Sequence, residues 1–130
     1  MIGIDTNVLV RYIVQDHQVQ SKKATEFIES LTPKTSGFIS SIVLCELNWV
    51  LKSAYGIDKN KRIAVIDTIL STSVFEIEDM TASMKALRSY ENGKADYSDY
   101  LIREVMLDAG CETIMTFDKA ALLDKGFKSP

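Results

Sequence analysis

Short apolar runs alternate with longer helical patterns along almost the whole chain. The apolar runs lie near residues 1–4, 36–39, 74–76 and 113–116. The helical patterns lie near residues 7–14, 18–31, 40–54, 59–70, 81–91 and 97–109, with a short one after Asp118. Such alternation is typical of parallel strands joined through helices that cover both faces of their sheet. We therefore expect an α/β fold, a three-layer α/β/α sandwich with a central, mostly parallel sheet of four to five short strands.

Length and composition fit a single domain spanning residues 1–130. A chain of 130 residues can bury roughly two thirds of its unfolded surface. Its hydrophobic content of 46% and charged content of 25% are ordinary for a globular protein. No basic region precedes the first strand and no apolar run approaches about 18 residues, so we expect a cytoplasmic protein without membrane contact.

Zinc and disulfide chemistry find little support in the sequence. The only histidine, His17, has no cysteine or histidine at zinc-ligand spacing, which favours a surface or capping role. Cys45 and Cys111 are too few and too isolated for a disulfide scaffold. The net charge of −3 gives no overall attraction to nucleic acid.

Two aspartates stand where predicted strands end. Asp5 follows the first apolar run, and Asp118 follows the run at 113–116. Ligands collect at the carboxyl ends of strands in an open parallel sheet. Each aspartate could equally be the N-cap of the helix that follows it, since Asp is a preferred capping residue.

Three more acids lie on helical patterns. Glu46 interrupts a segment, 40–51, that is apolar on nearly every side, so we expect a buried carboxylate that needs a metal ion or an arginine as its partner. Asp96 and Asp99 lie one helical turn apart at the start of the next-to-last helical pattern. They could cap that helix, or both could face one ion.

Four segments together resemble the ordered motifs of PIN domains, and their length and style are most similar to the VapC toxins of toxin–antitoxin pairs. These segments are residues 4–11 (IDTNVLVR), 43–51 (VLCELNWVL), 95–102 (ADYSDYLI) and 116–118 (TFD). The resemblance implies a ribonuclease that depends on Mg²⁺ or Mn²⁺. It also implies a homodimer and a small antitoxin that occludes the site with an arginine or an apolar helix.

The same resemblance implies roles for individual residues. The metal ligands would be the acids Asp5, Glu46, Asp99 and Asp118. Asp96 matches a position that is acidic only in some members of the family. Thr6, Asn7 and Thr116 would orient carboxylates or water. Arg11, one helical turn after Asn7, is the basic residue we expect to contact RNA or a partner protein.

Oxygen ligands suit this chemistry. Hard Mg²⁺ and Mn²⁺ prefer carboxylates and keep several waters, so substrate phosphate can complete the shell. Crowded carboxylates without metal raise one another's pKa, so we expect activity to fall in mildly acidic buffer.

Two other functions fit parts of the pattern. A Mg²⁺-dependent phosphatase or receiver domain also places aspartates at strand ends, but it needs one Asp as phosphoryl acceptor, and nothing singles out such a residue. The second alternative is a nucleic-acid-binding module of the same fold with little or no catalysis, but the acids present at all four motif positions favour an enzyme.

Overall fold

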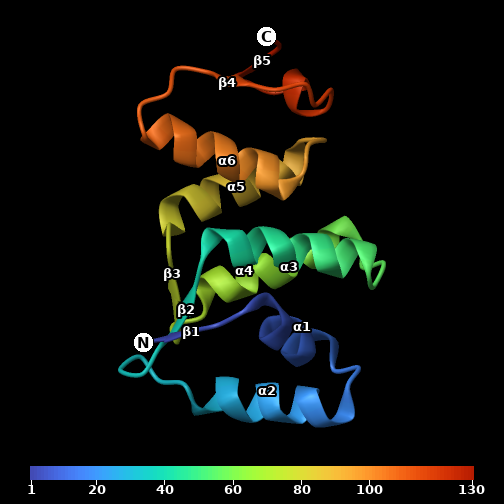
Figure 1. The fold of residues 1–130 in the computed structure, drawn as a ribbon, viewed down its shortest axis with the longest axis vertical. Coiled ribbons are helices and arrows are strands. Elements are labelled where there is room, and N and C mark those ends of the chain that lie inside the picture. Colours follow the sequence, from blue (N-terminus) through green and yellow to red (C-terminus); the bar gives the residue numbers. More distant parts are fainter. The chain divides into compact units, whose positions relative to one another are not determined.

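The computed structural model describes residues 1–130, and the chain forms two compact units, Met1–Glu78 and Asp79–Pro130 (Figure 1). The first unit contains β1 (Ile2–Gly3), α1 (Thr6–Val14), α2 (Gln18–Ser30), β2 (Gly37–Ile39), α3 (Ser41–Ser53), α4 (Lys59–Ser71) and β3 (Phe75–Ile77). The second contains α5 (Met80–Asn92), α6 (Tyr97–Asp108), β4 (Ile114–Met115), the 3-10 helix η1 (Ala121–Leu123) and β5 (Phe127–Lys128). The predicted α/β class and all six long helices are confirmed.

The strands form two parallel sheets. In the first unit β1 pairs with β2 and β2 with β3, with Gly37 opposite both Ile2 and Phe75. In the second unit β4 pairs with β5, with Ile114 opposite Phe127. The prediction of a single sheet of four to five strands differs from this three-plus-two division. Strand β5 was not predicted, because two residues after Gly126 are too short to show an alternating pattern.

Leucine and isoleucine side chains form the core of the first unit. Leu9 of α1, Ile39 of β2, Leu44 and Leu47 of α3 and Ile66 of α4 are at most 1% exposed. Helix α1 packs against α2 and α3, and α3 packs against α4. Burying each large aliphatic side chain contributes roughly 1.5–3 kcal/mol, so this core fixes α1 and α3 against each other.

Helix α3 corrects one expectation. Its buried face contains Leu44, Leu47 and Leu51, but Ile42 and Trp49 are 72% and 66% exposed, and Glu46 is exposed as well. The helix therefore buries one face and not every side. Glu46 is not an isolated buried carboxylate, so its charge needs no compensation for burial.

Polar side chains begin the helices. Ser40 caps α3 by accepting a hydrogen bond from Val43 N–H at 3.2 Å. The His17 ring caps α2 through Nδ1, which accepts from Gln20 N–H at 3.1 Å. The capping role expected for His17 is confirmed, and N-caps of this kind contribute about 1 kcal/mol each.

Helix α4 is anchored by a buried arginine. Arg62 is 5% exposed, and its guanidinium donates to Asn48 Oδ1 on α3 at 3.1 Å and to the Ile57 carbonyl. Ile66, Ile69 and Leu70 of the same helix are buried. These three apolar residues of α4 thus belong to the core of the first unit, whereas Ile63 and Val65 are half-buried.

A tyrosine cluster joins α5 to α6 in the second unit. The rings of Tyr97 and Tyr100 lie 6.0 and 6.4 Å from that of Tyr90, and all three are at most 2% exposed. Such tilted aromatic pairs contribute to stability beyond the effect of their buried area.

No helix in either unit has both the length and the apolar character that crossing a lipid bilayer requires.

Candidate metal and nucleic-acid site

Asp5 lies between the end of β1 and the start of α1. Its backbone is extended, with φ −81° and ψ 159°, and its Oδ1 accepts a hydrogen bond from Thr6 N–H at 2.8 Å. Asp5 is therefore the N-cap of α1, as the capping alternative predicted. A carboxylate has two oxygens, so capping is compatible with a metal bond through the other one.

Thr6 connects Asp5 to Glu46. The Thr6 hydroxyl, which is 8% exposed, donates to Glu46 Oε1 at 3.0 Å across the contact between α1 and α3. Asp5, Thr6 and Glu46 line one cleft of about 340 Å³. Asp5 and Glu46, which lie on different elements and are distant in sequence, thus present two carboxylates to the same hollow.

The same cleft contains a cation. Arg11 and Tyr55 line it together with Asn7 and Val50. The guanidinium of Arg11 donates through Nη1 to Tyr55 Oη at 3.0 Å and to Asp16 Oδ1 at 3.1 Å. Tyr55 and Asp16 were not predicted as site residues, because no motif in the sequence links either of them to Arg11.

Asp16 is held in its charged form. Loss of surrounding solvent acts to raise the pKa of Asp16, but hydrogen bonds from Tyr55 and the backbone and the charge of Arg11 outweigh it and lower the pKa below its ordinary value. Asp16 is therefore a carboxylate at neutral pH.

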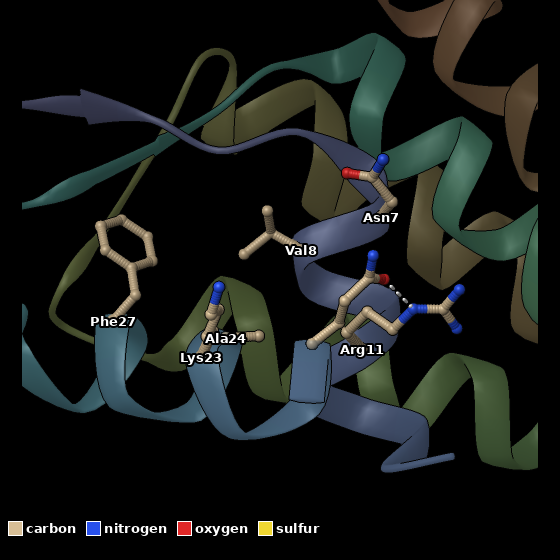
Figure 2. A pocket seen from close by; sticks show the side chains of 7 residues that line it. Asn7, Val8, Arg11, Lys23, Ala24 and Phe27 are labelled. Atoms are coloured by element: carbon tan, nitrogen blue, oxygen red, sulfur yellow. Dashed lines mark hydrogen bonds between the residues drawn. The ribbon is translucent and has the colours of Figure 1, made fainter. Parts of the chain in front are cut away.

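A second hollow borders Arg11 on its other side, between α1 and α2 (Figure 2). It has a volume of about 320 Å³ and is lined by Asn7, Val8, Arg11, Gln20, Lys23, Ala24 and Phe27. Arg11 Nε donates a hydrogen bond to Gln20 Oε1 at 2.8 Å, and the dashed line at Arg11 in Figure 2 marks this bond. Asn7 and Arg11 therefore border both hollows.

In the second unit, two aspartates begin α6. Asp96 is the N-cap, and Asp99 Oδ2 accepts a hydrogen bond from Asp96 N–H at 3.0 Å to complete a capping box. The capping alternative stated for this pair is therefore observed. The arrangement fixes the Asp99 carboxylate beside the first turn of the helix.

Asp118 follows β4 and begins the turn that leads to η1. Its Oδ1 accepts from Ala121 N–H at 2.8 Å, and its own N–H donates to Thr116 Oγ1 at 3.0 Å. Thr116 thus contacts the backbone of Asp118 and shapes the turn that carries the carboxylate.

Asp99 has a perturbed pKa. Partial burial is the largest cause and raises the pKa, a hydrogen bond from Asp96 N–H acts against it, and the negative charges of Asp118 and Asp96 raise it further. The charges of Asp96 and Asp118 therefore both act on the Asp99 carboxylate. A divalent cation relieves repulsion of this kind.

A buried tyrosine fixes the surroundings of these acids. Tyr100 is fully buried, and its Oη accepts from Ala95 N–H at 3.3 Å and donates to Asp124 Oδ2 at 2.5 Å. Burial and then the bond to Asp124 raise the pKa of Tyr100 to about 12, so the hydroxyl keeps its proton. One hydroxyl thus links the residue before Asp96 to the segment that follows Asp118.

Arg103 supports the tyrosine from the next turn of α6. Its guanidinium lies over the rings of Tyr100 and Phe127, at 5.2 and 5.7 Å, and donates to the Lys125 carbonyl at 3.0 Å. Neither Tyr100 nor Arg103 was expected near the site. Asp124, a partner of Tyr100, and Lys125, a partner of Arg103, lie more than twenty residues away in sequence, and no local pattern shows such a pairing.

The PIN domain model matches residues 2–127. The chain belongs to the PIN domain family. No curated protein matches the sequence. PIN domains are generally nucleases that use divalent metal ions such as Mg²⁺ and act on nucleic acid.

The acids of this PIN domain are divided between its two units. Asp5 and Glu46 belong to the first unit, and Asp96, Asp99 and Asp118 belong to the second. Neither unit alone gathers three acidic, histidine or cysteine side chains that could hold a metal ion. Carboxylate oxygens are ligands that suit Mg²⁺ or Mn²⁺ and not a thiolate- or imidazole-preferring metal.

Proposed function

We propose that this PIN domain is a metal-dependent endoribonuclease, and that it is the toxin of a VapBC-type toxin–antitoxin pair. The observation that carries the proposal is the cleft in which Asp5 and Glu46, joined by Thr6, lie with Arg11. Carboxylates for a hard cation and an arginine for a phosphate in one hollow are what hydrolysis of a phosphodiester requires. The family match over residues 2–127 supports one domain over residues 1–130.

In this proposal Asp5, Glu46, Asp99 and Asp118 bind Mg²⁺ or Mn²⁺. Bound there, the ion would lower the pKa of a water and offset charge on the phosphate. Asp99 and Asp118 act on each other electrostatically before any ion binds, which supports their assignment as ligands. Asp96 contributes charge from the N-cap of α6.

Other residues hold the acids and the substrate. Thr6 fixes the rotamer of Glu46 through its hydroxyl, and Thr116 holds the turn of Asp118. Asn7 lies in the first turn of α1 and lines the same cleft. Arg11 binds a phosphate of the RNA.

The proposed reaction is hydrolysis. A water oxygen bonds to phosphorus, the bond from phosphorus to O3′ breaks, and the departing O3′ takes a proton. The products are a 5′-phosphate and a 3′-hydroxyl, as the resemblance to the family implies.

The proposed partners are an antitoxin and a second copy of the chain. An apolar hollow of about 300 Å³ lies in the first unit, lined by residues of α1, α2, α4 and β3 that include Leu9, Ile13, Val65 and Phe75. An apolar helix of an antitoxin fits the chemistry of this hollow.

The test is cleavage of total cellular RNA by purified protein with Mg²⁺ or Mn²⁺, with EDTA as the metal-free control. We expect discrete cuts that EDTA abolishes and that Asp5→Asn reduces by at least about a hundredfold, because metal assistance contributes several kcal/mol. Asparagine also caps helices, so α1 is retained.

Asp58→Asn is the matched control, since Asp58 is the N-cap of α4, where its Oδ1 accepts from Lys61 N–H, and it lies outside the cleft. Equal loss in both variants would contradict the proposed role of Asp5. Folded wild-type protein that binds RNA but makes no cuts would favour a nucleic-acid-binding module.

A further inference from the structure

Arg11 is held by three partners before any RNA binds. Nε donates to Gln20, and Nη1 is shared between Asp16 and Tyr55. The guanidinium therefore has a fixed position in the cleft that Asp5 and Glu46 line. Fixing a side chain in advance reduces the entropy that a ligand must offset on binding.

The partner that Arg11 holds is itself an anion. Asp16 lies 3.1 Å from Nη1 and also receives a hydrogen bond from Tyr55. A guanidinium and a hydroxyl that converge on an oxyanion make the same contacts with a phosphate as with a carboxylate. Arg11 and Tyr55 thus form an anion-binding subsite that the Asp16 carboxylate occupies.

Displacement of the Asp16 carboxylate by a phosphate costs little free energy. The side chains of Arg11 and Asp16 are 28% and 40% exposed, and partly exposed ion pairs contribute only about 0–1 kcal/mol. Asp16 also lies in the turn between α1 and α2, outside both helices. It can leave the subsite without disturbing either helix.

We propose that Arg11 and Tyr55 form a phosphate subsite for single-stranded RNA beside the Asp5–Glu46 cleft, and that Asp16 occupies this subsite until RNA displaces it. The inference rests on the proposed ribonuclease function and adds Tyr55 and Asp16 to it. Asp16 acts as an internal competitor. Its removal therefore strengthens RNA binding, although Asp16 touches no part of the reaction.

The decisive experiment measures the affinity for a short, fluorescently labelled RNA of random sequence, with Asp5→Asn as the background and EDTA present so that the RNA stays intact. Asp16→Asn is compared with Glu26→Gln. Each removes one negative charge, but Glu26 faces Lys22 on α2, away from the cleft. We expect Asp16→Asn to lower Kd by about two- to fivefold and Glu26→Gln to change it much less.

Two further variants identify the subsite. In an Arg11→Met background the gain from Asp16→Asn disappears, and Tyr55→Phe weakens RNA binding by itself. An equal effect of Asp16→Asn and Glu26→Gln, or a gain that persists without Arg11, would overturn the proposal in favour of a general charge effect.

Cleavage assays separate this inference from the function on which it rests. In the otherwise wild-type protein, Asp16→Asn lowers KM and leaves kcat unchanged. Cleavage that Asp16→Asn leaves unaltered in both constants refutes the subsite and keeps the ribonuclease. RNA binding with the expected variant pattern but no cleavage keeps the subsite and refutes the ribonuclease, and wild-type protein that neither binds nor cuts RNA refutes both.

Discussion

The acids of the first unit share their cleft with a cation, whereas those of the second unit act mainly on one another. In the first unit a single hydroxyl, that of Thr6, joins α1 to the partly solvated Glu46. In the second unit a fully buried Tyr100 holds the chain on both sides of the acids. Under the proposed function, the first unit would bind a phosphate and the metal, and the second unit would bind the metal.

Removal of the Tyr100 hydroxyl, which links Ala95 to Asp124 in the second unit, has the largest expected effect on stability. Tyr100→Phe leaves the Ala95 N–H and the Asp124 carboxylate without their shared partner. We expect a loss of about 1–3 kcal/mol in the free energy of unfolding, measured by urea denaturation. Tyr12→Phe is the control, since Tyr12 is half-buried and its hydroxyl makes no hydrogen bond within the protein. Equal losses of unfolding free energy in the two variants would refute the stabilising role of the Tyr100 hydroxyl.

Removal of the Thr6 hydroxyl, which links α1 to Glu46 in the first unit, should lower the affinity for metal and leave stability unchanged. Thr6→Val removes the hydrogen bond to Glu46, but the exposed carboxylate then bonds to water. We expect Mn²⁺ affinity, measured by electron paramagnetic resonance, to fall by about tenfold while the unfolding free energy changes little. Thr68→Val, which removes a hydroxyl on α4, serves as control. An unchanged Mn²⁺ affinity in Thr6→Val would show that the Thr6 hydroxyl does not position Glu46 for metal binding.

The smallest predicted effect concerns the repulsion within the second unit. Asp118→Asn removes a negative charge that raises the pKa of Asp99, so the pKa of Asp99 should decrease. Carbon-detected NMR titration of the metal-free protein measures it. Asp108→Asn, at the far end of α6, should leave the pKa of Asp99 unchanged. If Asp118→Asn also left this pKa unchanged, Asp118 and Asp99 would not interact.

The sign of this effect determines its consequence for pH. Because the pKa of Asp99 is raised, the folded protein takes up this proton at a higher pH than the unfolded chain does. Without metal, the contribution of Asp99 to stability therefore increases as pH falls through the raised pKa. Under the proposed function the effect on metal binding is opposite, because a protonated carboxyl is a poor ligand, and we therefore expect activity to fall in mildly acidic buffer.

Much of the fold was predictable because helix periodicity and capping residues are local signals. The bounds of α4 and α6 were predicted to within a residue of those observed, and the weakly indicated strand at 74–76 is present as β3. The environment of Glu46 was predicted wrongly, because apolar composition does not reveal which face of α3 is covered. The partners of Arg11 and Tyr100 were missed because tertiary packing brings them together, as with Tyr55, forty-four positions from Arg11.

The Tyr100 hydroxyl occupies space that exists only because residue 93 is glycine. A Cβ at Gly93 would lie 1.7 Å from Tyr100 Oη and 2.6 Å from Cζ, although the φ of −96° is open to any residue. The requirement at this position is therefore one of volume and not of backbone conformation. Residue 93, in the loop between α5 and α6, therefore cannot carry a side chain unless Tyr100 moves.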